Sequence, residues 1–413
     1  MIPGEGGPFG NTLDGAGRIT YHSALPDSSP PLPPEAGIVK FEIQQEALQK
    51  ALDLVAGVVP SKTTLPILRS ILVEAEASAL RFSVTNLDIS MVTVTGDVEI
   101  AEPGKAAVLA EKLTNFVRSL APGSVQVTVT GGRLFIRAGK AALEESCLNP
   151  DEFPAFPSVI EGDGLAASGD ALTAMIGETI YSVSRDETRP ALMGILWEVS
   201  PEGLTMVATD AHRLARSRRK FEWDNDETRS MIVDTAGLRQ LSRVVAQAGE
   251  TPVEIFLGQT QLSFRAGPTV LHTRLLEGPF PDYNAVIPKG NDRIVTVDRE
   301  TLAQAIRRVS ITADRITSQI RLGLEKDRLE LSAKGSDGSR AEDEVTVGYR
   351  GKAMEIGFNY TYLIDILKNM RVDAVQLSLR DPQSAALITP IGEDGAVDDS
   401  LLCLLMPLRL ASD

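Results

Sequence analysis

The pattern of hydrophobic and polar positions from residue 38 onward predicts six amphipathic helices. Apolar residues recur at helical spacing, as in Leu48, Leu52 and Val55, so that one face of the helix is apolar. A short strand precedes each predicted helix. The six strand-and-helix segments span residues 39–57, 106–121, 165–184, 230–248, 294–313 and 353–370.

Strand-like runs fill the chain between these helices. They span residues 67–73, 80–85, 91–100, 125–129, 133–138, 192–199, 204–208, 253–257, 261–266, 320–324, 329–333, 344–349, 375–379, 385–389 and 401–405. Any α+β chain can be divided into similar pieces, but the same order of elements occurs three times at near-equal spacing. The pattern therefore predicts an α+β fold of three tandem copies of a two-helix unit with antiparallel sheets.

The first 37 residues differ from the rest, because they contain seven Pro and seven Gly and no apolar periodicity. Such a segment cannot bury enough apolar surface to offset the entropy of ordering it. We expect a disordered extension over 1–37, although an over-long start-codon assignment would give the same pattern. The predicted domains are 38–160, 161–290 and 291–413.

Composition indicates a globular protein, with 43% hydrophobic and 23% charged residues. Cys147 and Cys403 lie far apart in apolar surroundings, which favours buried thiols in a reducing cytoplasm. The three histidines cluster neither with each other nor with cysteine, so no metal site is expected. Neither a membrane-spanning run nor a signal peptide is visible, and we expect a cytoplasmic protein without a membrane partner.

The charge distribution changes the meaning of the net charge of −15, which by itself argues against a nucleic-acid partner. The predicted helices carry a net charge of +2, which leaves −17 for the rest of the chain. Matching of side chains to helix dipoles explains part of this difference. The remainder would permit weak contacts with phosphates that do not depend on sequence, and no helix resembles a base-reading element.

Enzymatic chemistry has little support in the sequence. No phosphate-binding loop, dinucleotide-binding glycine motif or nucleophile elbow is present, so neither an enzyme nor a cofactor is expected. Asp210 and His212 are two residues apart after a strand and would suit a hydrolase, but no nucleophile completes the set. We favour the alternative in which Thr209 and Asp210 bind the local backbone while His212 and Arg213 lie at the rim of a pocket.

Four segments together resemble one known family. They are 64–68 (TLPIL), 208–215 (ATDAHRLA), 278–288 (GPFPDYNAVIP) and 405–410 (LMPLRL). They resemble the bacterial DNA sliding clamp, the β subunit of DNA polymerase III, and the likeness runs from about residue 38 to 410. The resemblance implies three similar domains, and two chains joined head to tail in a closed six-domain ring around duplex DNA.

The function implied by this resemblance is processivity without catalysis. The ring would tether the replicative DNA polymerase by topology, and weak contacts with the DNA backbone suit a protein that must slide. A separate ATP-dependent clamp loader would place it on DNA. A hydrolase and a repeat scaffold that binds only proteins remain as alternatives; the scaffold predicts no topological retention on circular DNA.

The resemblance also implies a pocket between the second and third repeats for peptides of the polymerase, the loader and other proteins with clamp-binding motifs. Ala211 and Ala285 stand where the family often has Gly and Arg, which affects motif preference. The pocket residues carried over by position are Leu192, Thr209, Ala211, His212, Arg213, Leu214, Pro281, Val286, Leu404, Met406, Pro407, Leu408 and Arg409.

Sequence-independent DNA contacts are expected from basic residues on the loops and helices. Pro190 and Ala191 stand where some relatives have aromatic residues, so stacking on DNA is not expected from them. The candidate DNA-binding residues are Lys62, Arg118, Arg185, Arg189, Arg239, Arg243, Arg307, Arg308, Lys368 and Arg371.

The head-to-tail pattern implied by the resemblance would bring a basic edge of the first repeat against an acidic part of the third at the dimer seam. Complementary charge would set the register of the two chains. Asp337 and Glu344 add to the acidic side, and Ile311 would pack near the centre. The candidate interface residues are Arg133, Arg137, Lys140, Ile311, Glu342 and Asp343.

Overall fold

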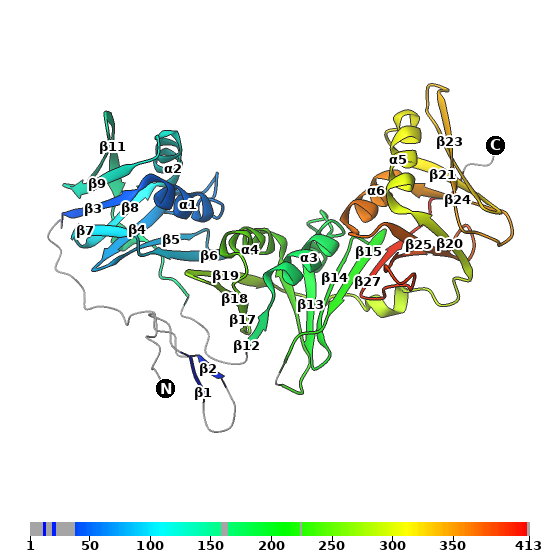
Figure 1. Ribbon diagram of the computed structural model, residues 1–413, viewed down its shortest axis with the longest axis horizontal. Coiled ribbons are helices and arrows are strands. Elements are labelled where there is room, and N and C mark those ends of the chain that lie inside the picture. The colour runs from blue at the N-terminus through cyan, green and yellow to red at the C-terminus, as the bar shows by residue number, and fades with distance from the viewer. Residues whose placement is uncertain (1–10, 14–18, 22–37, 158–163, 224, 411–413) are drawn as a thin grey trace. The chain divides into compact units, whose positions relative to one another are not determined.

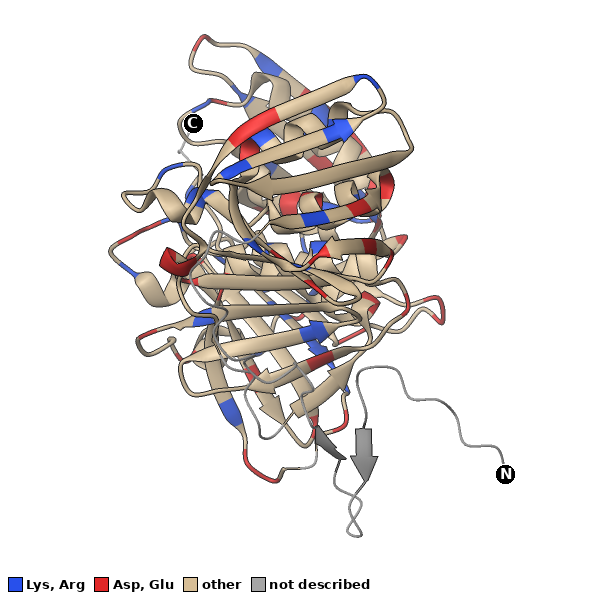
Figure 2. Ribbon diagram, turned by 90° about the vertical axis from the view of Figure 1, so that its left-hand side faces the viewer, with Lys and Arg blue, Asp and Glu red and all other residues tan. Residues whose placement is uncertain are grey.

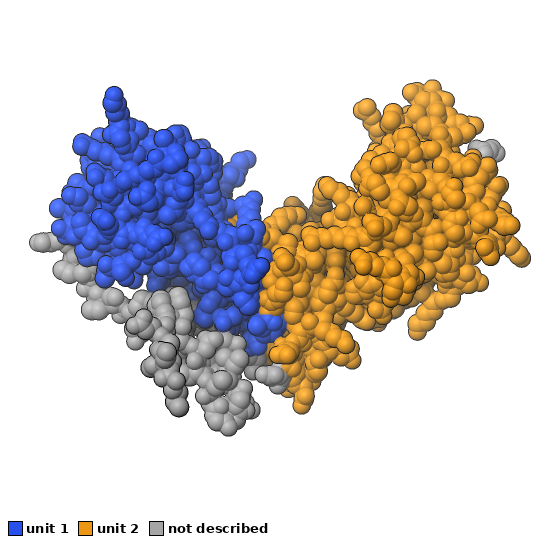
Figure 3. Space-filling view, in the orientation of Figure 1, with its two compact units in different colours: residues 1–166, 243–274 blue, residues 167–242, 275–413 orange. Residues whose placement is uncertain are grey.

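The computed structural model describes residues 11–13, 19–21, 38–157, 164–223 and 225–410 (Figure 1). The chain forms two compact units, 1–166 with 243–274 and 167–242 with 275–413 (Figure 3). Within 1–37, where no regular structure is predicted, β1 (Asn11–Leu13) pairs antiparallel with β2 (Ile19–Tyr21). The prediction of a disordered extension is therefore wrong for these two short strands, and its remainder lies outside the described residues.

All six predicted helices are confirmed, and each follows a strand directly or after one residue. Ser168, Asp298 and Asn359 begin three of them, because their side chains accept backbone N–H groups of the first turn. The helices carry nine basic and seven acidic residues, a net charge of +2, as predicted. They are α1 (Gln45–Val55), α2 (Ala110–Ser119), α3 (Gly169–Ile180), α4 (Thr235–Ala248), α5 (Arg299–Val309) and α6 (Tyr360–Asn369).

The first unit contains two antiparallel sheets, ordered β11-β10-β9-β3-β7 and β8-β4-β5-β6-β19-β18-β17. The β6–β19 pair joins the first repeat to the second, with Met91 opposite Leu271. The strands are β3 (Val39–Gln44), β4 (Ser70–Glu76), β5 (Ala79–Thr85), β6 (Ile89–Thr95), β7 (Val98–Glu102), β8 (Gly104–Leu109), β9 (Ser124–Thr130), β10 (Arg133–Ala138), β11 (Ala141–Leu148), β12 (Gly164–Ala167), β17 (Val253–Leu257), β18 (Gln261–Ala266) and β19 (Thr269–Leu276).

The second unit contains a long sheet ordered β16-β13-β14-β15-β27-β26-β25-β20 and a four-stranded sheet ordered β23-β22-β21-β24. The β15–β27 pair joins the second repeat to the third, with Leu214 opposite Leu404. The strands are β13 (Gly194–Ser200), β14 (Gly203–Thr209), β15 (Arg213–Arg219), β16 (Arg229–Asp234), β20 (Arg293–Asp298), β21 (Gln319–Glu325), β22 (Arg328–Lys334), β23 (Arg340–Thr346), β24 (Met354–Asn359), β25 (Ala374–Leu379), β26 (Ala386–Ile391) and β27 (Leu401–Leu405).

Several predicted strand limits were wrong. The runs 67–73 and 192–199 begin as 3-10 turns, η1 (Pro66–Arg69) and η3 (Pro190–Met193), because proline fixes a helical φ at the first position. The run 91–100 is two strands, β6 and β7. Strands β11, β15 and β19 were not predicted.

Side chains on β15 and β27 alternate between two apolar clusters, because successive residues of a strand point to opposite faces. Ala215, Cys403 and Leu405 belong to the larger cluster, which includes residues of α5 and α6. Leu214 and Leu404 belong to a smaller cluster on the other face, and this second face carries the candidate site.

The two thiols are both free, and only Cys403 is fully buried as predicted, whereas Cys147 is half-buried. Burial raises the pKa of the Cys147 thiol to about 11 and that of the Cys403 thiol to about 12, so both stay protonated. None of the described helices is long and apolar enough to cross a membrane.

Candidate partner-binding site

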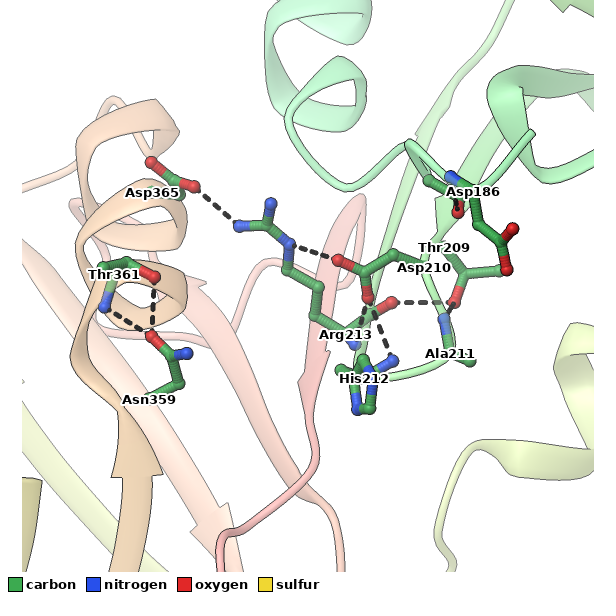
Figure 4. Close-up of polar contacts among 10 residues, drawn as sticks. Asp186, Thr209, Asp210, Ala211, His212, Arg213, Asn359, Thr361 and Asp365 are labelled. Atoms are coloured by element: carbon green, nitrogen blue, oxygen red, sulfur yellow. Dashed lines mark hydrogen bonds and ion pairs between the residues drawn. The ribbon is translucent and has the colours of Figure 1, made fainter. Parts of the chain in front are cut away.

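The turn between β14 and β15 is held by its own side chains (Figure 4). The Thr209 hydroxyl donates to the Arg213 carbonyl oxygen at 2.7 Å and accepts the Ala211 N–H at 3.2 Å. The Asp210 Oδ1 accepts the backbone N–H groups of His212 and Arg213, each at 2.9 Å. This confirms the prediction that Thr209 and Asp210 bind the local backbone.

Asp210 and His212 do not form a catalytic pair. The Asp210 Oδ2 accepts the Arg213 Nε–H at 3.1 Å, so both carboxylate oxygens are already bonded. The His212 ring stacks beside Tyr362, with 6.5 Å between ring centroids. Asp210 therefore does not orient the His212 ring, which removes the geometric basis of the hydrolase hypothesis.

Arg213 lies inside the protein, with 8% of its surface exposed, and its predicted place at the pocket rim is wrong. Its guanidinium bridges Asp210 and the Asp365 Oδ2, which accepts a hydrogen bond from Nη1 at 2.7 Å (Figure 4). The guanidinium carbon also lies 4.3 Å from the Tyr362 ring centroid and 5.5 Å from that of Tyr181. Arg213 thus fixes the turn to α6 and to the residue that follows α3.

Tyr181, Tyr362 and Asp365 were missed by sequence reasoning. A partial signal was available, because Tyr362 and Asp365 are three residues apart in a predicted helix and therefore share a face. Their contacts with Arg213 are long-range and depend on the pairing of β15 with β27.

The smaller apolar cluster forms the floor of the candidate site. It contains Leu214 from β15, Leu404 from β27 and Tyr283 from η4 (Tyr283–Val286), with Phe280 and Ile287 packed against it. All the predicted pocket residues lie in the second unit. Leu192, Arg213, Leu214 and Leu404 are buried; Thr209, Pro407 and Leu408 are half-buried; Ala211, His212, Pro281, Val286, Met406 and Arg409 are exposed.

Two large apolar side chains of this set are exposed, Val286 at 57% and Met406 at 42%. They extend the apolar character of the buried floor to the surface. Val286 shares η4 with Tyr283, and Met406 directly follows β27. Exposed apolar residues adjoining buried members of an apolar cluster suit the docking of a short apolar peptide.

The C-terminal segment is anchored rather than freed by Pro407. The Met406 N–H donates to the His212 carbonyl oxygen at 2.8 Å, and the Leu408 N–H to that of Gly357 at 2.8 Å. A Cβ at Gly357 would lie 2.8 Å from the Leu408 carbonyl oxygen, so this approach requires glycine. Leu408 thus leaves the sheet of β27 and forms an isolated bridge with Gly357 of β24.

The ten candidate DNA-binding residues are all exposed, and four of them already have carboxylate partners. The pairs are Arg118 with Asp53 (2.6 Å), Arg189 with Asp186 (2.9 Å), Arg307 with Glu300 (3.4 Å) and Arg308 with Asp343 (2.6 Å). Acidic and basic residues are interspersed in the view of Figure 2. The last pair joins a candidate DNA contact to a candidate seam residue.

The candidate seam residues lie near two sheet edges. Arg133 and Arg137 are on β10, but the outer strand is β11, whose Glu144 pairs with Arg133 at 2.7 Å. The basic edge expected here is therefore mixed in charge. Glu342 and Asp343 lie on the edge strand β23, and Ile311 is 83% exposed. In the described part of the chain, no group of three or more His, Cys, Asp or Glu side chains is placed to bind a metal ion.

Comparisons with known proteins agree with the fold. Family models of the DNA polymerase III beta subunit match the N-terminal domain at 39–157, the central domain at 167–282 and the C-terminal domain at 284–409. The beta sliding clamp of Pseudomonas putida is 35% identical over 374 residues, with 90% of this chain and all of that protein covered. That of Escherichia coli K12 is 30% identical over 373 residues, with the same coverage.

Solved structures agree as well. The Pseudomonas aeruginosa sliding clamp has a TM-score of 0.83 at 33% identity, and the Bacillus subtilis sliding clamp has 0.85 at 27%. In both cases 90% of this chain and all of the other chain are covered. This chain belongs to the beta sliding clamps, the non-catalytic subunits that make bacterial DNA polymerase III processive in DNA replication.

Proposed function

We propose that two copies of this chain join head to tail into a closed ring of six domains that encircles duplex DNA. The domains are 38–160, 161–290 and 291–413. The observation that carries the proposal is the net charge of +2 on the six helices of a chain whose net charge is −15. Helices lining the hole would attract phosphates weakly, and weak contacts permit sliding.

Topological retention distinguishes this proposal from a scaffold that binds only proteins. The protein is placed on nicked circular DNA by its ATP-dependent loader and separated from free protein by gel filtration. A ring stays on the circle in high salt and is lost when the DNA is cut once. Loss from the intact circle at the same rate as from linear DNA would refute encirclement.

The apolar site on the second unit is proposed to hold short peptides of the replicative polymerase, the clamp loader and other DNA-processing proteins. Support comes from the exposed apolar side chains of Val286 and Met406 and from the buried apolar cluster that contains Leu214 and Leu404. The site would work in the cytoplasm, where DNA is replicated.

The dimer seam is proposed to join the β11 edge of one chain to the β23 edge of the other. Neither Arg137 nor Lys140 has an ion-pair partner among the described residues, so both are available to the acidic strand β23. We expect Arg137→Glu with Lys140→Glu to weaken the dimer, and added salt to weaken the native seam modestly. Sedimentation equilibrium measures both effects; unchanged sedimentation of the double variant would refute the charge assignment.

A further inference from the structure

Arg216 is a buried cation with an unused donor. It lies on β15, two residues after Leu214, and therefore on the face that carries the apolar site. Only 8% of its surface is exposed. Its Nη2 donates to the Asp399 carbonyl oxygen at 3.3 Å, while its buried Nε has no hydrogen-bond partner among the described residues. An unpaired buried N–H group is costly, which points to an acceptor that arrives with a ligand.

The surrounding charges leave this cation without a carboxylate of its own. Within the described chain, neither Arg216 nor Arg218, the next residue on the same face, is in an ion pair. Glu198 is engaged by the Tyr283 hydroxyl, which donates to it at 2.5 Å. Burial lowers the pKa of Arg216, and nearby Arg218 lowers it further, against weaker opposing effects of Tyr283 and Asp399. A bound anion would offset both the cost of burying the Arg216 charge and the repulsion between Arg216 and Arg218.

The position of Arg216 fits a peptide already held by the apolar floor. Val207 and Leu402, which flank Arg216 on the neighbouring strands, are members of the same apolar cluster as Leu214 and Leu404. Residues two apart on a strand are about 7 Å apart, which is also the span of two residues in an extended peptide. A peptide anchored over Leu214 can thus place a nearby side chain over Arg216.

We propose that Arg216, assisted by Arg218, forms a carboxylate subsite at the edge of the partner-binding site, which selects peptides with an Asp or Glu side chain beside their apolar anchors. This inference rests on the proposed peptide site. The site would then recognise an acidic side chain of the peptide in addition to its apolar residues, because a guanidinium binds a carboxylate through directional hydrogen bonds as well as charge.

Fluorescence anisotropy of labelled, C-terminally amidated peptides tests the subsite. Each peptide carries two Leu and one Phe as anchors, with Asp or Asn placed before, between or after them. We expect one Asp position to bind the wild-type protein roughly tenfold more tightly than its Asn counterpart. Arg216→Gln should abolish that difference, and Arg218→Gln should reduce it. Lys220→Gln removes the same charge from an exposed neighbour and should leave the difference unchanged.

The outcomes separate this inference from the proposed peptide site. If no peptide binds, or if Met406→Ala leaves binding unchanged, the peptide site itself is wrong and the subsite falls with it. If peptides bind without preference for Asp, or if the preference survives in Arg216→Gln, only the subsite is wrong. A preference that appears only with a free C-terminus would overturn the assignment to a side-chain carboxylate. Thermal unfolding of each variant verifies that the fold is kept.

Discussion

Ala211 lies in the turn of the candidate site, in a backbone conformation that L-residues rarely adopt. Its φ is 74°, in the left-handed region, where a Cβ crowds the following carbonyl oxygen. Glycine has no Cβ and adopts this conformation without that cost. We expect Ala211→Gly to raise the free energy of unfolding by about 0.5–1 kcal/mol, measured by urea denaturation. Ala215→Gly, in the buried middle of β15, is the control and should lower it; an equal loss in both would contradict the strain.

His272 makes the stability of the first unit depend on pH. Burial lowers the pKa of its ring to about 4 from the usual 6.5, while its Nδ1 lies 2.8 Å from the Ser263 hydroxyl oxygen. Between pH 6.5 and about 4, His272 therefore binds a proton in the unfolded chain but stays neutral in the folded chain. The free energy of unfolding should fall between pH 6.5 and about 4, by about 3 kcal/mol in total.

His272→Asn keeps a hydrogen-bond acceptor for Ser263 but does not titrate. Its free energy of unfolding should consequently change less than that of the wild type between pH 6.5 and 5, before most carboxylates titrate. Urea denaturation at half-unit pH steps measures the two slopes. Equal slopes would show that His272 takes up its proton as readily in the folded protein as in the unfolded chain.

At the scale of elements, the helices were predictable because their buried positions follow one period. Leu302, Ile306 and Val309 recur at helical spacing and are all buried. Strand β15 could not be found in this way, because its sequence RLARSRR buries Arg213 and Arg216 alongside Leu214 and Ala215. Its burial depends on partners far along the chain, above all β27 and α3, which no local pattern reveals.

The candidate site, too, was predictable only in part. The apolar positions around Leu214 and Leu404 were reached by resemblance, and the structure places both in one cluster. The burial of Arg213 was not predicted, because Tyr181 and Asp365 approach Arg213 only when strands from two repeats pair. Contacts within one turn, such as those of Thr209 and Asp210, were predictable because they involve neighbours in sequence.

The C-terminal segment is an element of the site as well as of the fold. Deleting Met406–Asp413 removes the exposed Met406 and the bond from Leu408 to Gly357, so we expect peptide binding to be lost and the second unit to be less stable. The dimer should persist, because β24 and β23 lie at opposite edges of their sheet. Anisotropy and sedimentation measure the two effects. Deletion of 411–413 alone is the control; a dissociated dimer in the longer deletion would contradict the separation.

At the scale of the whole molecule, antiparallel strand pairing joins each repeat to the next. The β6–β19 pair continues one sheet from the first repeat into the second, and the β15–β27 pair does so from the second into the third. The second repeat is consequently shared between the two compact units. The candidate site lies at the second of these junctions, where strands from two repeats supply opposite halves of one apolar floor.

The helices of the proposed ring should not contribute equally to its hold on DNA. Arg239 and Arg243 on α4 are exposed and have no ion-pair partner among the described residues, whereas Arg307 and Arg308 on α5 pair with Glu300 and Asp343. A cation already paired gains less from a phosphate, although exposed pairs are weak. We therefore expect Arg239→Ala with Arg243→Ala to weaken binding to duplex DNA more than Arg307→Ala with Arg308→Ala.

Equilibrium binding to linear duplexes across a series of salt concentrations measures this difference, because topology does not hold a ring on linear DNA. The α4 double variant should also make the plot of log binding constant against log salt less steep by up to about 4, since the two chains of the ring together lose up to four phosphate contacts. Lys289→Ala with Lys326→Ala removes two exposed bases outside the helices and should change neither quantity. The losses should be the same on every DNA sequence, because phosphate contacts carry no sequence information. Strong sequence selectivity would refute the ring tether, and a larger loss from the α5 pair would show that its ion pairs open on DNA.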